Sequence, residues 1–406
     1  MKGIRLIILL FALAAIPPAK AQQRFLPPVA ADDSTATAAL LTCAPGADIY
    51  SLEGHSGLRL RYGTTDVVAN WGMFDFNAPH FVYRFVKGET DYSIGVCPTE
   101  YFLLSYAHQQ RRVTQQTLNL TPGQVAALVE AVDRNLQPEN RIYRYNYVRD
   151  NCATRPLKLI ENAIGAEIVL TQSPAQAEKM STFRNEMRYF HKNYLWYQFG
   201  IDICLGSGLD QEIDSREMMF APVILEELAA TARIGSGPRS GAPLVTATEI
   251  LADGPADGPI LGPTPWYQGP VAAIGLLLLI TILLTIADRR KNRVSRWFDF
   301  LLFGIFGIMG CVVAFLVFIS VHEASSPNWL LTWMNPLCLI VPLTVYIRKA
   351  RKITGWFHLY NITATTIFFI IAATGVQSIN PALLLLAGCG LIRSINFTLN
   401  ATSKDR

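Results

Sequence analysis

The chain has 406 residues, of which 51% are hydrophobic and 16% are charged, and its formal net charge at pH 7 is +4. This apolar content excludes an ordinary soluble enzyme, and the apolar residues are concentrated in the last third. The modest positive charge comes largely from short basic segments there, so it gives no reason to expect nucleic acid as a partner.

Residues 1–21 have the features of a secretory signal peptide. A basic start, MKGIR, is followed by an apolar run from Leu6 to Ile16 and by the small-x-small sequence Ala19-Lys20-Ala21. The run is about a dozen residues long, too short to span a bilayer core of about 30 Å. We therefore expect cleavage after Ala21 and export of the segment that follows.

The exported part divides into three segments by composition. Residues 22–39 are rich in Pro, Ala, Ser and Thr and are predicted to be a flexible lead-in. Residues 40–234 are long enough for a single compact domain. Residues 235–269 are rich in Gly, Pro and Ala without periodicity, which predicts a linker to the membrane.

Within the compact domain, both strands and helices are predicted. Residues 47–63 alternate apolar and polar side chains, and with residues 66–76 they predict a hairpin. Residues 121–136 open with Thr-Pro-Gly-Gln, a helix start, and residues 151–165 form a second helix that Asn151 can cap. The predicted fold class of this domain is α+β.

Cys152 and His55 are the candidate catalytic pair. A helix N-terminus and a neighbouring histidine lower the pKa of a thiol, and the thiolate is the nucleophile. Cys152 follows Asn151 at the start of a predicted helix, whereas His55 lies on a predicted strand between Gly54 and Gly57, which permit close approach. We predict Cys152 as nucleophile and His55 as general base.

A third group would orient the imidazole, and the sequence leaves two choices. Asn70, on the neighbouring strand, is the better placed, and Asp75 is the competing choice. Asn151 and Arg59 are predicted as supporting residues. Because neither HExxH nor paired CxxC spacing occurs, no metal is expected, and no cofactor is predicted.

The chain has seven cysteines. In an oxidising compartment, those of the exported domain can form disulfides, and a pair between Cys43 and Cys97 is one expectation because Cys152 must stay a free thiol. The connectivity among Cys43, Cys97 and Cys204 stays open. Those in the apolar stretches are expected to be inert: Cys311, Cys338 and Cys389.

An aromatic cluster lies in the segment NWGMFDFNAPHFVYRF. One interpretation is packing within the core and the hairpin, and the other is the wall of a groove for an acyl chain or another substrate. Its members are Trp71, Phe74, Phe76, Phe81, Tyr83 and Phe85.

Residues 270–400 are predicted to be a membrane domain of about five helices, followed by a cytoplasmic tail, residues 401–406. The apolar stretches are Pro270 to Ala287, Phe300 to Val321, Leu330 to Ile347, Phe357 to Val376 and Pro381 to Leu399. Arg393 lies within the fifth stretch, and we expect its side chain to snorkel to the cytoplasmic surface.

Basic residues between the stretches set the orientation. The second and fourth connections contain no Lys or Arg and are predicted to lie outside, together with everything before Pro270. The first and third are predicted to be cytoplasmic, since they hold Arg289, Arg290, Lys291, Arg293 and Arg296, and Arg348, Lys349, Arg351 and Lys352.

The order of a histidine on a strand and a later Asn-Cys at a helix start resembles the circularly permuted papain-like thiol enzymes, which include NlpC-type peptidases. The segments LLTCAPGADIYSLEGHSGLRLR, NWGMFDFNAPHFVYRFVKGETDYSIG, RIYRYNYVRDNCATRP and FGIDICLGSGLDQEI resemble the Lnb family, and so does HEASSPNWLLTWMNPL in the membrane part. This resemblance covers nearly the whole mature chain.

The resemblance implies N-acylation of bacterial lipoproteins, with Cys152 as nucleophile and His55 as base. The implied donor is a phospholipid, the implied acceptor is a diacylglyceryl-cysteine lipoprotein, and the implied location is the bacterial inner membrane with the catalytic domain in the periplasm. Two alternatives stay open: a papain-like envelope hydrolase acting on cell-wall peptides or lipid amides, and a non-enzymatic envelope binding protein.

Overall fold

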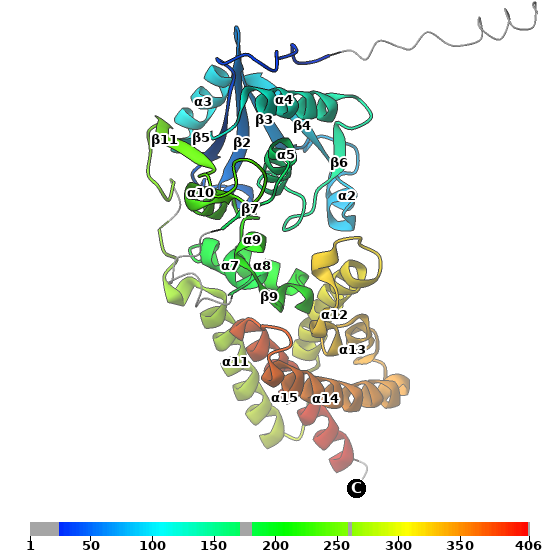
Figure 1. Cartoon of the computed structure of the whole chain (residues 1–406). Coiled ribbons are helices and arrows are strands. Elements are labelled where there is room, and N and C mark those ends of the chain that lie inside the picture. The colour runs from blue at the N-terminus through cyan, green and yellow to red at the C-terminus, as the bar shows by residue number, and fades with distance from the viewer. Residues whose placement is uncertain (1–23, 171–180, 259–261, 405–406) are drawn as a thin grey trace, which may run out of the picture.

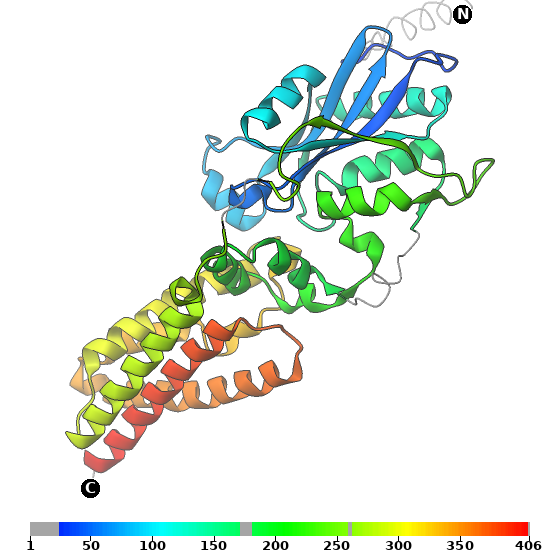
Figure 2. The same ribbon diagram turned by 90° about the vertical axis from the view of Figure 1, so that its left-hand side faces the viewer.

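The computed structural model describes residues 24–170, 181–258 and 262–404, and the predicted signal peptide, residues 1–21, lies outside them. Figures 1 and 2 show two parts, a β-sheet covered by helices and a bundle of long helices that contains the C-terminal end. The predicted order of an α+β domain followed by a helical membrane domain is confirmed.

A seven-stranded antiparallel sheet forms the frame of the first part, in the order β11-β5-β1-β2-β3-β4-β6. The predicted hairpin is present as β2 and β3, which pair from Tyr62 with Thr65 to Gly57 with Asn70. The strands are β1 (Thr37–Cys43), β2 (His55–Tyr62), β3 (Thr65–Met73), β4 (Asp91–Pro98), β5 (Val113–Leu118), β6 (Ile142–Arg144) and β11 (Val245–Ala252).

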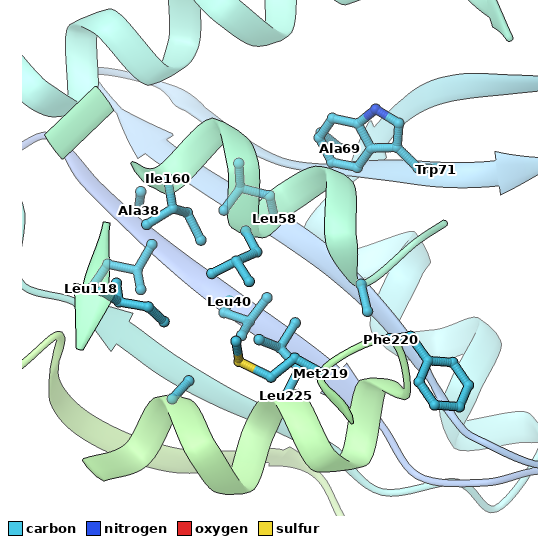
Figure 3. Close-up of a cluster of buried hydrophobic side chains, with 14 of the residues drawn as sticks. Ala38, Leu40, Leu58, Ala69, Trp71, Leu118, Ile160, Met219, Phe220 and Leu225 are labelled. Atoms are coloured by element: carbon cyan, nitrogen blue, oxygen red, sulfur yellow. The ribbon is translucent and has the colours of Figure 1, made fainter. Parts of the chain in front are cut away.

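Alternation along the strands directs side chains into two cores on opposite faces of the sheet. Leu40 and Leu58 belong to the larger core, part of which Figure 3 shows, and Leu41 and Val68 belong to the smaller one. The larger core is covered by α4 (Pro122–Leu136), α5 (Thr154–Ile164) and α10 (Pro222–Thr231), and the smaller one by α3 (Thr99–His108).

The two predicted helices are α4 and α5. Thr121 caps α4 through a capping box, in which its hydroxyl accepts from the Gln124 N–H and the Gln124 side chain accepts from the Thr121 N–H. The shorter elements of this part are η1 (Ile49–Ser51), α2 (Phe81–Lys87), β7 (Ile168–Val169), β8 (Ser181–Thr182), α7 (Phe183–Phe190), α8 (Leu195–Cys204), η2 (Ser207–Asp210), β9 (Glu212–Ile213), α9 (Ser215–Met218), β10 (Arg233–Ile234) and η3 (Trp266–Gln268).

The prediction of a flexible lead-in over residues 22–39 is wrong for its described part. Leu26 is buried in the larger core, and the N–H groups of Phe25 and Leu26 donate to the Asp133 carboxylate at 2.7 and 2.9 Å. Strand β1 then begins at Thr37. The polar composition is misleading because backbone pairing with the folded domain holds the segment in place.

The linker predicted over residues 235–269 also contains structure. Its β11 pairs with β5 and forms one edge of the sheet. Most side chains of β11 are exposed, so the strand has no buried apolar face that a sequence pattern could reveal. The composition predicts a linker here, but pairing with β5 makes the segment a strand.

The predicted disulfide between Cys43 and Cys97 is not formed, and both cysteines are free. Cys43 lies on β1 and Cys97 on β4, with β2 and β3 between them. Three strand spacings of about 4.8 Å exceed the distance that a disulfide can bridge.

The described residues contain four helices long and apolar enough to cross a membrane: α11 (Pro270–Arg290), α12 (Arg296–Phe318), α14 (Arg351–Thr374) and α15 (Pro381–Lys404). The third predicted stretch is a series of short helices instead of one long one, comprising η5 (Trp329–Thr332), η6 (Pro336–Leu339) and α13 (Ile340–Thr344). Pro336 and Pro342 favour this interruption, and the Asn335 backbone packs so closely on Gly310 of α12 that a Cβ there would clash. Two further turns, η4 (Glu323–Ser325) and η7 (Arg348–Ala350), complete this part.

The two connections predicted to lie outside are those that contact the first part. The Val321 N–H donates to the Lys87 carbonyl oxygen, and the Asn380 side chain donates to the Asp202 carboxylate. The basic connections lie at the other end of the bundle (Figure 2). This arrangement agrees with the predicted orientation.

Arg393 does not snorkel, contrary to the prediction. Its side chain is fully buried and donates to Asp299 of α12 at 2.6 Å and to Asp288 of α11 at 2.9 Å. Because these carboxylates neutralise the guanidinium inside the bundle, it need not reach the membrane surface. The three side chains join α11, α12 and α15.

Arg393→Met is expected to destabilise the membrane part by about 3–5 kcal/mol, because it removes the buried cation that bonds to two buried carboxylates. Thermal unfolding in detergent measures this effect. Arg293→Met is the matched control, since Arg293 is exposed and lies 3.7 Å from the same Asp288. Equal unfolding temperatures for the two variants would contradict the assignment.

Candidate active site

The structure brings His55, Asn70 and Cys152 together. His55 is the first residue of β2, and Asn70 lies on the adjacent strand β3, opposite Gly57. This register places Asn70 diagonally across from His55 on the same face, where Nε2 of His55 donates to Oδ1 of Asn70 at 2.5 Å. The other ring nitrogen, Nδ1, is left for the thiol.

Asn151 shapes the turn that holds Cys152. Its Oδ1 accepts from the N–H groups of Ala153 and Thr154 at 2.8 and 3.0 Å. Helix α5 begins at Thr154 with Ala153 at its N-cap position, so Asn151 fixes the turn before the helix and is not itself the N-cap residue that we predicted. Its Nδ2 donates to the carbonyl oxygens of Tyr147 and Phe220. All four bonds are made by a nearly fully buried amide, which fixes the backbone immediately before the cysteine.

Ser56 ties this turn to the sheet. Its hydroxyl donates to the carbonyl oxygen of Cys152 at 2.6 Å, and its backbone N–H bonds to the thiol sulfur. Since Ser56 follows His55 directly, one short piece of β2 positions both the imidazole and the cysteine.

The thiol and the imidazole shift each other's pKa. Burial raises the pKa of Cys152, but the charge and the hydrogen bond of His55, together with bonds from the Ser56 N–H and the Tyr145 hydroxyl, lower it below its ordinary value. Burial also lowers the pKa of His55, yet Cys152 and Asn70 raise it above its ordinary value. Both shifts favour a thiolate–imidazolium pair, the reactive form of a cysteine nucleophile.

Tyr145 and Gly72 are site residues that the sequence analysis did not single out. The Tyr145 hydroxyl bonds to the Cys152 sulfur, and burial raises the pKa of Tyr145 well above its ordinary value, so it stays a donor. Gly72 has a φ of +89°, and a Cβ there would lie 3.9 Å from the Cβ of Cys152. The nearby sequence YNYVRDNC gave a signal for Tyr145, because it places polar groups just before the cysteine.

A buried polar network supports the loop that precedes His55. Glu53 accepts from His191 Nε2 at 2.9 Å and also bonds to the Tyr147 hydroxyl, while Nδ1 of His191 bonds to Gln198 at 2.7 Å. This network connects the loop before β2, the loop before Cys152, the residue that follows α7, and α8. His191 therefore has a structural role in positioning the site.

Two predicted residues do not join the site. Asp75 is exposed in the turn after β3, where its carboxylate accepts from the Asn77 N–H, so Asn70 fills the orienting position. Arg59, predicted as supporting, forms an ion pair with Asp66 and bonds to Gln115. It is four residues beyond His55 along β2, about 13 Å away along an extended strand.

His55→Gln is expected to raise the pH at which Cys152 reacts with iodoacetamide, because burial then raises the thiol pKa without an opposing positive charge. The reaction rate at neutral pH should fall at least about tenfold. Mass spectrometry of the Cys152 peptide over a pH series measures this. His108→Gln, at an exposed histidine of α3, is the control, and an unchanged pH profile for His55→Gln would refute the pairing.

Asn70→Ala should lower the pKa of His55, because the hydrogen bond that helps to raise it is lost. The weaker positive charge then stabilises the thiolate less, so Cys152 alkylation at neutral pH should slow by about tenfold. Asp75→Ala should leave the rate unchanged. The reverse result would assign the orienting role to Asp75.

Each of the two parts matches a model of a known protein family. Residues 29–189 match the family model of the Lnb N-terminal periplasmic domain, and residues 264–405 match that of the Lnb transmembrane domain. Searches of curated proteins and of solved structures gave no match. The two matches together cover about three quarters of the chain and include all three residues of the site.

Proposed function

Because the chain belongs to the Lnb family, we propose that it is a membrane-bound lipoprotein N-acyltransferase that uses Cys152 as its nucleophile. The donor would be a phospholipid, and the acceptor would be the terminal amine of a diacylglyceryl-cysteine lipoprotein. The proposed location is the bacterial inner membrane, with the site on its periplasmic side.

One observation carries this proposal: the Cys152, His55 and Asn70 arrangement belongs to a domain that docks directly on membrane-spanning helices. The loop before Cys152 contacts the outer connection of the membrane part, where Asn146 donates to Glu323 and Arg149 lies 3.5 Å from it. Donor and acceptor are both confined to the membrane, so a site held beside that plane raises their effective concentration.

In the first half-reaction, the Cys152 thiolate attacks the ester carbonyl carbon of the phospholipid. A carbon–sulfur bond forms, the ester carbon–oxygen bond breaks, and the leaving lysophospholipid oxygen takes the proton that the His55 imidazolium carries. The products are a lysophospholipid and a thioester on Cys152. Tyr145 and the Ser56 N–H also bond to the sulfur and supply further donors at this reacting centre.

In the second half-reaction, the lipoprotein amine attacks the thioester. A carbon–nitrogen bond forms and the carbon–sulfur bond breaks, while neutral His55 accepts the proton that the amine loses. The pKa of an α-amino group is about 7.7–8.0, so a useful fraction is the free base near neutral pH. The thiolate–imidazolium pair is restored.

Limited access of water favours an amine acceptor over hydrolysis. Cys152 is only 7% exposed, and Ser56, Tyr145 and Gly72 lie around it. A lipid-anchored amine delivered from the membrane competes well with water in such a site.

The test is mass spectrometry of lipoprotein N-terminal peptides from cells that lack other N-acylation activity. The native chain should add an amide-linked acyl chain, and Cys152→Ala should abolish it because no thioester can form. His55→Gln should reduce the modification at least about a hundredfold. Cys97→Ala is the control, since Cys97 is another free cysteine of the same domain and lies on β4.

Unmodified amines with the folded and inserted native protein would refute the transferase. Release of free fatty acid that depends on Cys152 would then assign the site to a hydrolase. Full acylation of the lipoprotein peptides by the Cys152→Ala variant would exclude Cys152 as the nucleophile.

A further inference from the structure

An exposed aromatic surface lies between the candidate site and the membrane part. We use the name aromatic surface for the side chains of Phe74, Phe76, Phe81, Tyr83 and Phe85, which lie on the segment after β3 and on α2. Phe76, Tyr83 and Phe85 are 60%, 54% and 48% exposed. Core packing, one of the two interpretations of this cluster, therefore applies to Trp71, which is fully buried, and not to these residues.

The inner end of the aromatic surface reaches Cys152 through two tyrosines. Tyr145, whose hydroxyl bonds to the thiol, stacks on Tyr92 with ring centroids 4.4 Å apart. Tyr92 in turn contacts Phe74 at 5.2 Å. Ring contacts thus run without a gap from the sulfur to the first residue of the aromatic surface.

From Phe74 the ring contacts continue along α2. Phe74 lies 5.8 Å from Phe81, and Phe81 lies 5.9 Å from Phe85. Phe76 contacts both Phe74 and Phe81, at 4.6 and 5.2 Å. No residue of α2 is fully buried, so these rings form a continuous face instead of a core.

The outer end contacts a membrane-spanning helix. Tyr83 lies 6.1 Å from Phe315 of α12, and Phe85 contacts the ring of His322 just beyond that helix. The backbone is also joined, since the His322 side chain bonds to the Phe85 carbonyl oxygen at 2.7 Å. Figure 1 shows α2 directly beside the end of α12.

The aromatic surface is continuous with the lipid-facing surface of α12. Phe318 at the outer end of this helix, and Ile319 and Val321 just beyond it, are 77%, 53% and 65% exposed, as expected for side chains that meet hydrocarbon. Exposed apolar side chains grouped in this way mark an interaction surface, because single scattered ones would need no explanation. Continuity with α12 makes its partner the hydrocarbon of the same membrane.

We propose that the aromatic surface binds the acyl chain of a membrane phospholipid and guides its ester carbonyl to Cys152. The guidance of the ester carbonyl to Cys152 rests on the proposed function, whereas the binding of lipid by the aromatic surface does not depend on it. Aromatic rings in continuous contact, some stacked and some tilted, offer an apolar track for a flexible chain, and the ring contacts end at the thiol.

The test uses the full chain reconstituted in vesicles of phosphatidylethanolamine and phosphatidylglycerol, with a synthetic diacylglyceryl-cysteine peptide as acceptor. Phe76→Ser/Phe85→Ser removes two exposed rings of the aromatic surface. Tyr101→Ser/Leu104→Ser on α3 is the matched control, since these residues are 67% and 48% exposed. Acyl transfer from the vesicle lipid should fall by about tenfold in the first variant alone.

Two further measurements separate lipid delivery from chemistry. Acylation of Cys152 by the water-soluble p-nitrophenyl butyrate should be the same in both variants and the native chain. A phosphatidylethanolamine with a photoactivatable acyl chain should crosslink to the peptide that contains residues 74–87 of the native chain, and less to Phe76→Ser/Phe85→Ser.

Native rates of transfer from vesicles in Phe76→Ser/Phe85→Ser would overturn the inference, and so would an equal loss of the p-nitrophenyl butyrate reaction. If the native chain transfers no acyl group but crosslinks within residues 74–87, the lipid surface stands and the proposed function fails. Transfer by the native chain with crosslinks only elsewhere would reject the surface and keep the function.

Discussion

The hydrogen bond from the Ser56 hydroxyl to the Cys152 carbonyl joins the sheet to the N-terminus of α5, and the candidate site depends on this junction. Ser56 alternates with His55 along β2, so the strand directs one side chain to the cysteine backbone and the preceding one to the reacting face. The pairing of β2 with β3 then brings Asn70 to the imidazole. Three separate stretches of chain thus meet at a single strand end.

Burial disfavours the charged forms of Cys152 and His55, which the proposed chemistry needs. Removal from water would keep both the thiol and the imidazole neutral. Only their mutual attraction, with hydrogen bonds from Ser56 and Tyr145 to the sulfur and from His55 to the Asn70 oxygen, reverses the direction of both pKa shifts. Such a pair is sensitive to small displacements, which explains the fully bonded Asn151 amide before the cysteine. The buried Glu53 and His191 network adds rigidity behind the strand.

The membrane part holds the candidate site at a defined position relative to its own helices. Its outer connections bond to α2, to the segment after α8 and to the loop before Cys152, so the proposed acyl transfer would take place at a fixed height above the bilayer. Inside the bundle, Arg393 between Asp288 and Asp299 holds three helices together. The proposed lipid-binding surface on α2 lies between these two parts.

The sequence by itself determined the membrane pattern, the hairpin, the two helices α4 and α5 and the pairing of His55 with Cys152, because these depend on local periodicity, charge and helix-start signals. Only the tertiary structure decided that Asn70, and not Asp75, contacts His55. It also decided that Leu26 is buried, that β11 joins the sheet, that Cys43 and Cys97 are free, and that Arg393 is enclosed in the bundle. Each of these outcomes depends on a partner far away in the chain. A β-strand with exposed side chains or a charge that finds its counter-ion on another helix leaves no local pattern, so its position follows from the packing of the whole molecule.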